Sequence, residues 1–497
     1  MRRFKMNGRI FVLGAVLILV GCSAAPEQVI VNDAAEALGG TQRVQAVNTL
    51  VIEGTGENTN LGQSLTPDAL NVFNVTQAKK SIDFANNRWR LEQSRIATFG
   101  PPNPQPQAQN QGVDGDVAYN LGANGMAQRA AEQIAKDRRM ELFHHPIGAV
   151  KAALAQGTRL TNPRTEGSES SVVVTTAQGD KFTLFTDSTT KLPTKVTSMT
   201  SATTNWLLGD AVVETSFTDY ADVDGLKLPA RLTMKTDQYP GGHLQITKNT
   251  VNGDVGDLAA PEAAKSAAAP PAVPPPVVTA EEVGKGIWYL AGQSHHSILV
   301  EFADHLALIE APQNEVRVGA VLDKVKELRP NKPLRYVVNT HAHFDHSGGL
   351  RRIMAETGIT IITQEGNKAF YEAIAKRDST IYPDTLSKAP RAPVIQTVTD
   401  KYELKDATRT VELHHIQNLH SNTMLIAYFP AERFLVEADL YNPPAPNTPP
   451  PPQGFPNAKS VVDTVQRLKL RPDRVLPIHG FVVPYRSLES AVRATAS

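Results

Sequence analysis

Hydrophobic positions along the first half of the chain gather in short runs that are typical of β-strands. Runs rich in β-branched and aromatic residues recur between short polar turns, at 49–54, 88–92, 171–175, 181–185, 212–217 and 231–235. This pattern predicts a largely antiparallel sheet up to about residue 256. Helices are expected near 34–40 and over 138–155, and the Pro- and Gln-rich stretch 100–112 is expected to be a loop.

The pattern changes from residue 278 onward, where strands alternate with helices. Apolar runs predict three successive strands, at 286–290, 297–302 and 305–310. Apolar side chains on one helical face predict a helix over 315–328, and the run 334–340 predicts a buried strand. Strands that alternate with outer helices allow a site to form between two sheets.

Residues 259–277 separate the two patterns and are rich in Ala and Pro, which is typical of a semi-rigid, extended linker. A chain of 497 residues is too long for one typical domain. We therefore expect a β-rich domain at 23–258 and a second domain at 278–497. The fifty basic and fifty acidic side chains cancel, so the charge favours neither nucleic acid nor an anionic membrane surface as a partner.

The first 22 residues have the features of a lipoprotein signal peptide. Basic residues within 1–5 precede an apolar run at 10–20, which is too short to span a membrane comfortably. The run ends in Leu-Val-Gly-Cys at Cys22, which resembles a bacterial lipobox and implies lipidation of that cysteine. Ser23 resembles the residue found in lipoproteins sent to the outer membrane, so we expect an envelope protein that faces the periplasm. An ordinary cleaved signal and an uncleaved anchor are the alternatives.

The stretch Thr-His-Ala-His-Phe-Asp-His-Ser-Gly-Gly, at 340–349, places four potential metal ligands directly after a predicted strand. His341 and His343 are two residues apart, so in an extended segment both can bind one ion. Asp345 and His346 follow in a turn and can face a second ion about 3.5–4 Å away. A structural zinc site is the alternative, but such sites rely on Cys, and Cys22 is the only one in the chain.

At these residues the sequence resembles the metallo-β-lactamase superfamily, whose signature is H-x-H-x-D-H after a strand. The resemblance implies an α/β (α+β) protein with an αββα sandwich in its second half. The implied ligands are His341, His343 and His420 for one ion, Asp345, His346 and His479 for the other, and Asp439 as the bridge between them. Leu419 and Glu310 depart from the family pattern, which has a small residue and Asp at these positions. Glu310 is expected to support the ligands.

The resemblance also implies a reaction on a small-molecule substrate. Two bridged divalent ions lower the pKa of a shared water, so hydroxide can attack a carbonyl or phosphoryl centre while Asp345 orients it or takes a proton. Zn²⁺ suits the ligands best, and Fe or Mn also fit. Asp439 resembles the esterase-like branches, whereas true β-lactamases carry Cys or Ser there. We expect hydrolysis of an ester, thioester, lactone or related bond. A β-lactamase-type amide hydrolase and a non-catalytic metal-binding carrier or sensor are the alternatives.

Several further residues allow two interpretations. The segment 220–229 faintly resembles the half-barrel domains of periplasmic lipoprotein carriers, which hold acyl chains, and a scaffold is the alternative. His295 and His296 precede a strand and either point into the cleft or lie exposed. Tyr371 and Tyr441 are candidates for substrate contacts.

Overall fold

The computed structural model describes residues 25–100, 103–201, 207–271, 273–445, 447–448 and 454–496. The expected signal peptide at 1–22 and the lipidation site Cys22 lie outside the described residues. Within these ranges, the helices are too short or too polar to cross a membrane.

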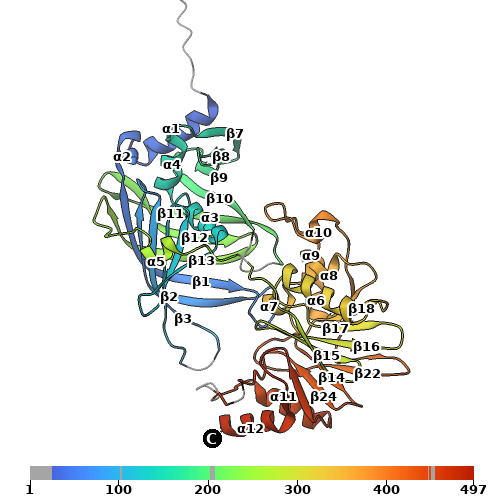
Figure 1. The fold of residues 1–497 in the computed structure, drawn as a ribbon. Coiled ribbons are helices and arrows are strands. Elements are labelled where there is room, and N and C mark those ends of the chain that lie inside the picture. The colour runs from blue at the N-terminus through green and yellow to red at the C-terminus, as the bar shows by residue number, and fades with distance from the viewer. Residues whose placement is uncertain are drawn as a thin grey trace, which may run out of the picture.

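The first half of the chain folds into one antiparallel sheet of 13 strands, called the N-terminal sheet below (Figure 1). The strand order is β6-β5-β4-β3-β2-β1-β13-β12-β11-β10-β9-β8-β7. The strands are β1 Thr49–Leu61, β2 Leu70–Asp83, β3 Arg88–Ala97, β4 Gln107–Asp114, β5 Val117–Leu121, β6 Ala127–Arg129, β7 Arg159–Glu166, β8 Glu169–Thr175, β9 Lys181–Asp187, β10 Pro193–Ser201, β11 Asp210–Val223, β12 Leu226–Thr236 and β13 Tyr239–Val251. Almost all neighbours are consecutive in the chain, because short turns join antiparallel strands. The predicted antiparallel sheet is confirmed.

Four helices accompany this sheet: α1 Pro26–Ala37, α2 Thr41–Ala46, α3 Glu132–Met140 and α4 Pro146–Leu154. The single helix expected over 138–155 is therefore wrong. Pro146 lacks an N–H and fits only the first turn of a helix, so a new helix begins there, capped by the His145 ring, which accepts from the Ile147 N–H. The loop expected at 100–112 is also too long, because β4 begins at Gln107 and pairs with β3.

The Ala- and Pro-rich stretch between the two halves contains a short helix, α5 Glu262–Ser266. Ala264 of this helix is fully buried and packs with Tyr119 of β5. This part of the expected linker therefore lies against the N-terminal sheet instead of extending away from it.

The second half contains two further sheets. The first has seven strands: β14 Thr279–Gly284, β15 Ile287–Ala291, β16 Ser297–Glu301, β17 Leu306–Ile309, β18 Leu334–Val338, β19 Thr360–Gln364 and β20 Val394–Val398. The second has six: β21 Lys401–Lys405, β22 Thr410–His415, β23 Leu425–Phe429, β24 Phe434–Glu437, β25 Arg474–Pro477 and β26 Val483–Pro484. The helices are α6 Glu315–Leu328, α7 Phe344–Ser347, α8 Leu350–Met354, α9 Lys368–Ile374, α10 Thr385–Lys388, α11 Ala458–Arg467 and α12 Tyr485–Ala496.

Three buried apolar clusters show how these elements are layered. One lies between the two sheets and joins Val300 of β16 to Leu413 of β22. A second places Val318 of α6 with Leu308 of β17, on the outer face of the first sheet. A third places α11 and α12 against the second sheet. The order helix, sheet, sheet, helix confirms the expected αββα sandwich, called the C-terminal sandwich below.

The N-terminal sheet contacts the C-terminal sandwich through the loop 62–69, which joins β1 to β2. In Figure 1 the ends of these two strands point toward α7. The Gly62 carbonyl accepts a hydrogen bond from the Phe344 N–H at 3.0 Å, inside the histidine-rich stretch. Away from this loop, the Arg377 guanidinium forms a half-buried ion pair with Asp237 at 2.5 Å. The two halves are therefore connected by polar contacts from the loop between β1 and β2 and from the turn between β12 and β13.

Candidate metal centre

The residues implied as metal ligands stand at or near strand ends of the C-terminal sandwich. His341 and His343 follow β18, and His420 precedes β23. Asp439 and His479 each come two residues after the end of β24 and β25. Because β24 and β25 are parallel neighbours, their ends meet at the same edge of the sheet. The strand pattern therefore brings ligands together from segments that are far apart in the sequence.

The Asp439 carboxylate is the point on which four imidazoles converge. Its Oδ2 lies 2.9 Å from Nε2 of both His346 and His420. The same oxygen is 3.2 Å from His341 Nε2, and Oδ1 is 2.8 Å from His479 Nε2. Asp439 has a φ of 64°, a left-handed conformation that Asp adopts more readily than most residues. The turn after β24 thus points this carboxylate at the histidines.

Two groups of possible ligands result, and within each group the ligand atoms lie within 4.8 Å of one another. The first is His341, His343, His420 and Asp439, and the second is His295, Asp345, His346 and His479. The structure therefore brings together all seven residues that the sequence singled out. It also adds His295, whose Nε2 lies 3.0 Å from Asp345 Oδ2, so of the two interpretations of this residue the one in the cleft is correct.

Two buried nitrogen atoms fit a metal ion better than any protein partner. His341 Nε2 and His343 Nδ1 are buried and form no hydrogen bond, although Asp439 Oδ2 lies 3.2 Å from His341 Nε2. The other nitrogen of each ring is engaged: His341 Nδ1 lies 3.1 Å from the Thr340 hydroxyl, and His343 Nε2 lies 3.0 Å from the Ser64 carbonyl. A carbonyl only accepts, so Nε2 of His343 carries the proton and Nδ1 offers a lone pair. Unpartnered buried nitrogens are costly, and a divalent ion would satisfy both.

The protonation states of His341 and His343 suit metal binding, whereas His346 would have to release a proton to an incoming ion. Burial lowers the pKa of His341 well below its usual range and that of His343 to about 4, so both rings are neutral at neutral pH. Burial acts in the same direction on His346, but the Asp439 and Glu310 carboxylates outweigh it and raise the pKa of that imidazole well above its ordinary value. Neutral imidazoles and carboxylates are the forms that bind divalent ions.

Glu310 occupies the supporting position expected from the sequence. It is fully buried, and its Oε2 accepts a hydrogen bond from His346 Nδ1 at 2.6 Å. Its Oε1 accepts from the Thr340 N–H at 2.7 Å, which holds the backbone of the histidine-rich stretch. The longer carboxylate therefore orients His346 with Nε2 toward Asp439.

The loop 62–69 of the N-terminal sheet completes the site, and sequence reasoning missed it. The Gln63 side-chain amide donates to Asp345 Oδ1 at 2.6 Å, although the two residues are 282 positions apart. The Leu65 carbonyl accepts from the Asn422 N–H at 2.8 Å, next to the His420 loop. A short polar loop between two strands has no periodicity or ligand spacing that would have revealed this role.

The tyrosines expected to contact substrate are buried behind the site, so that prediction is wrong. Tyr371 is fully buried, and its hydroxyl donates to Asn339 Oδ1 at 2.6 Å. Asn339 in turn donates to the His341 carbonyl at 2.8 Å, so Tyr371 supports the backbone of a ligand. Tyr441 is buried, with its ring 4.9 Å from that of Phe455.

His296 lies behind the site and not in the cleft, because it is buried and its Nε2 lies 3.1 Å from the Gly480 carbonyl. Two apolar side chains next to ligands are exposed instead. Leu419, which replaces the small residue of the family pattern before His420, is 90% exposed, and Phe481, two residues after His479, is 48% exposed. Leu419 and Phe481 thus expose apolar surface to solvent beside the ligands His420 and His479.

Residues 292–479 match the sequence model of the metallo-beta-lactamase superfamily. No curated protein sequence matches the chain significantly. Similar solved structures include a metallo-beta-lactamase from Pontibacter korlensis, at 17% identity over 44% of this chain and 98% of that chain, with a TM-score of 0.34. FIM-1 from Pseudomonas aeruginosa in its mono-zinc form is 16% identical over 45% and 97%, with a TM-score of 0.34. The sec-alkylsulfatase Pisa1 from Pseudomonas sp. is 17% identical over 44% and 42%, with a TM-score of 0.33.

Proposed function

Because residues 292–479 match the sequence model of the metallo-beta-lactamase superfamily, we propose that the chain is a metal-dependent hydrolase of an ester, thioester or lactone bond. The observation that supports the proposal most directly is the convergence of four imidazoles on the Asp439 carboxylate within 3.2 Å. Two ring nitrogens are buried beside this carboxylate without a hydrogen bond. Burying such atoms is costly unless something binds them, so a metal role explains these histidines better than a purely structural one.

The donor set divides between two divalent ions around one bridging carboxylate. His341, His343 and His420 would hold one ion, Asp345, His346 and His479 the other, and Asp439 would contact both. Ions held there would supply a water of lowered pKa and polarise the bond to be cleaved. Imidazole and carboxylate donors suit Zn²⁺, and Fe or Mn also fit.

Asp345 is the residue we assign to orienting the nucleophilic water during the reaction. Its Oδ1 accepts from Gln63 at 2.6 Å, and its Oδ2 lies 3.0 Å from His295 Nε2. Although burial opposes ionisation, the hydrogen bond to His295 lowers the pKa of this carboxyl well below its usual range. A carboxylate that is ionised and held from two sides can orient a nucleophilic water.

The choice of an ester-like bond rests on two observations. Position 439 is Asp, and the superfamily resemblance associates this residue with esterase-like branches and not with β-lactamases. The exposed Leu419 and Phe481 next to two ligands favour a substrate with an apolar part beside its reactive bond. A β-lactam amide is the second candidate bond.

We also propose that the chain is a lipoprotein anchored to the outer membrane through Cys22 and facing the periplasm. The lipobox-like Leu-Val-Gly-Cys sequence after an apolar run supports this proposal. Radiolabelled palmitate should enter the full-length protein in a bacterial host and not the Cys22→Ser variant. Equal labelling of both would contradict the proposal.

The experiment that tests the catalytic proposal compares hydrolysis by the chain from residue 23 onward with hydrolysis by His343→Ala and Asp439→Ala. The panel contains lactones, thioesters, carboxylic esters, phosphodiesters and β-lactams. His305→Ala, which removes a histidine from the turn before β17, far from the ligand-bearing ends of the strands, is the matched control. We expect one ester-like class to be cleaved by the wild type and the control only. Equal activity in all four proteins, or none in the metal-loaded wild type, would reject the proposal and favour a carrier or sensor.

A further inference from the structure

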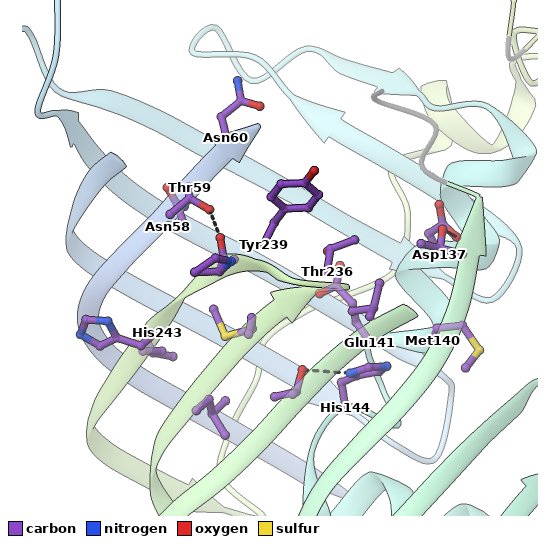
Figure 2. Close-up of a pocket in the computed structure, with 18 of the residues that line it drawn as sticks. Asn58, Thr59, Asn60, Asp137, Met140, Glu141, His144, Thr236, Tyr239 and His243 are labelled. Carbon is purple, nitrogen blue, oxygen red and sulfur yellow. Dashed lines mark hydrogen bonds between the residues drawn. The ribbon is translucent and has the colours of Figure 1, made fainter. Parts of the chain in front are cut away.

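A cavity of about 610 Å³ lies between α3 and the strands of the N-terminal sheet. Figure 2 shows side chains from several strands turned toward this space, with Met140, Glu141 and His144 together on one side. The volume is within the range of roughly 300–1,000 Å³ that ligand pockets occupy. The established features of the metal centre do not account for this cavity.

The wall of the cavity is mainly apolar. Half-buried side chains from four strands and from α3 contribute, among them Leu91, Ile134, Val213, Leu232, Met234 and Leu244. These residues are large and apolar, and they leave part of their surface uncovered inside a concave space. Such surface is stabilised when an apolar molecule replaces the water that covers it.

Several charged and polar groups in the wall already have protein partners. Lys80 forms an ion pair with Glu141 at 2.7 Å. His144 lies between the hydroxyls of Ser198 and Thr215, at 2.8 and 2.9 Å. Groups that satisfy one another do not call for a charged ligand. The part of a ligand that enters here is therefore expected to be uncharged and apolar.

One end of the cavity lies beside the metal centre. Leu61 and Leu70, which line the cavity, are paired at the ends of β1 and β2, and the loop 62–69 starts directly after them. Gln63, which donates to Asp345, follows Leu61 by two residues, so its backbone lies within about 7 Å of the cavity wall. The same hairpin therefore forms part of the cavity and part of the metal centre.

The packing of a second group of residues agrees with this arrangement. Leu208 and Tyr239 also line the cavity, and both belong to the apolar cluster that holds Val318 and Ile353 of the C-terminal sandwich. The end of the cavity formed by β11 and β13 is thus in contact with the domain that carries the metal ligands.

We propose that this cavity binds the apolar arm of the substrate whose reactive bond is cleaved at the metal centre. The inference rests on the proposed hydrolase function and narrows it to esters, thioesters or lactones that carry a long aliphatic chain. The loop 62–69 then lies between the chain-binding cavity and the reacting bond, and the N-terminal sheet selects the substrate.

Binding is tested directly with dansylamino-undecanoic acid, a fluorescent probe with a long aliphatic chain, and the whole chain. Val213→Trp fills the cavity, and its neighbour Val212→Trp places the same ring on the opposite, exposed face of β11. We expect the probe to bind the wild type and Val212→Trp equally, and Val213→Trp at least about tenfold more weakly. Leu232→Phe is the second filling variant if Val213→Trp does not fold. Equal binding by all variants, or no binding by the wild type, would overturn the proposal.

The link to the metal centre is tested with p-nitrophenyl esters from acetate to dodecanoate. In the wild type and Val212→Trp, kcat/KM should rise by up to about fourfold for each added methylene until the cavity is full. The ratio of dodecanoate to acetate should fall in Val213→Trp. The same ratio in both variants would overturn the proposal. If none of the esters, thioesters and lactones is cleaved but the probe still distinguishes the two variants, the hydrolase function fails and the cavity remains a binding site.

Discussion

The Ser64 carbonyl accepts a hydrogen bond from Nε2 of His343 at 3.0 Å, across the contact between the N-terminal sheet and the C-terminal sandwich. This bond places the proton of the ring on Nε2 and leaves Nδ1 free to bind a metal ion. A residue of one domain therefore sets the tautomer of a ligand in the other. The N-terminal sheet is thus part of the metal centre and not a spacer beside it.

The contact between Gln63 and Asp345 can be tested by mutation. Gln63→Ala removes the amide that donates to Asp345 Oδ1, so the carboxylate is held from one side only. We expect the affinity for the second metal ion to fall by roughly 10–100-fold, as is typical when a supporting partner is lost. Competition with a chromophoric chelator measures this affinity. The exposed Gln128→Ala is the control, and equal affinities in both variants would contradict the role given to the loop.

Glu310 offers a second test within the C-terminal sandwich. Glu310→Gln keeps an acceptor for the Thr340 N–H but cannot accept at both oxygens, so His346 loses its partner at Nδ1. We expect the affinity for the metal ion to fall by roughly 10–100-fold, so that dialysis removes more metal from this variant than from the wild type. The exposed Glu372→Gln should retain its metal. Retention by Glu310→Gln would show that His346 does not depend on this carboxylate.

Asp137, in the wall of the cavity, makes stability depend on pH. Burial raises the pKa of this carboxyl from 3.8 to about 6. The folded protein therefore holds a proton that the unfolded chain releases, and the stability from this proton is complete below pH 3.8 and lost as pH rises through 6. Asp137→Asn has no carboxyl to ionise, so its stability does not fall in this way as the pH rises. Its free energy of unfolding relative to wild type should therefore rise between these pH values by about 2 kcal/mol.

Urea unfolding at several pH values measures this difference for Asp137. The same measurement on the exposed Asp323→Asn of α6 is the control for the substitution itself. A flat difference for Asp137→Asn would show that the carboxyl is not buried in the folded protein.

Tyr371 is expected to affect stability more than substrate binding. Tyr371→Phe removes the hydroxyl that donates to Asn339, leaving a buried acceptor that has lost a partner. The free energy of unfolding should fall by about 1–2 kcal/mol, whereas the exposed Tyr382→Phe should be near neutral. Chemical denaturation gives both values. A rise in KM without loss of stability would instead support the original expectation of a substrate contact.

Much of the C-terminal sandwich could be predicted because its signals are local. The spacing of His341, His343, Asp345 and His346, and the strand ends before Asp439 and His479, are visible in consecutive residues. α6 begins and ends where its apolar periodicity does.

The remaining features depend on contacts between distant segments. Nothing near Gln63 or Ser64 in the sequence indicates that they meet residues about 280 positions later. The break between α3 and α4 has a local signal in Pro146, but helix-forming residues on both sides of it hide that signal. From the sequence alone Tyr371 is a candidate for substrate contact, because its partner Asn339 lies 32 positions away on a different segment.

The most direct test of the central claim is the metal content of the chain from residue 23 onward, measured by elemental analysis. We predict about two divalent ions per chain for the wild type and for His305→Ala. Asp439 contacts ligands of both groups, so Asp439→Ala should lose most of the bound metal while remaining folded. A wild-type protein without metal, or an Asp439→Ala variant that keeps both ions, would contradict the account of a centre built around this carboxylate.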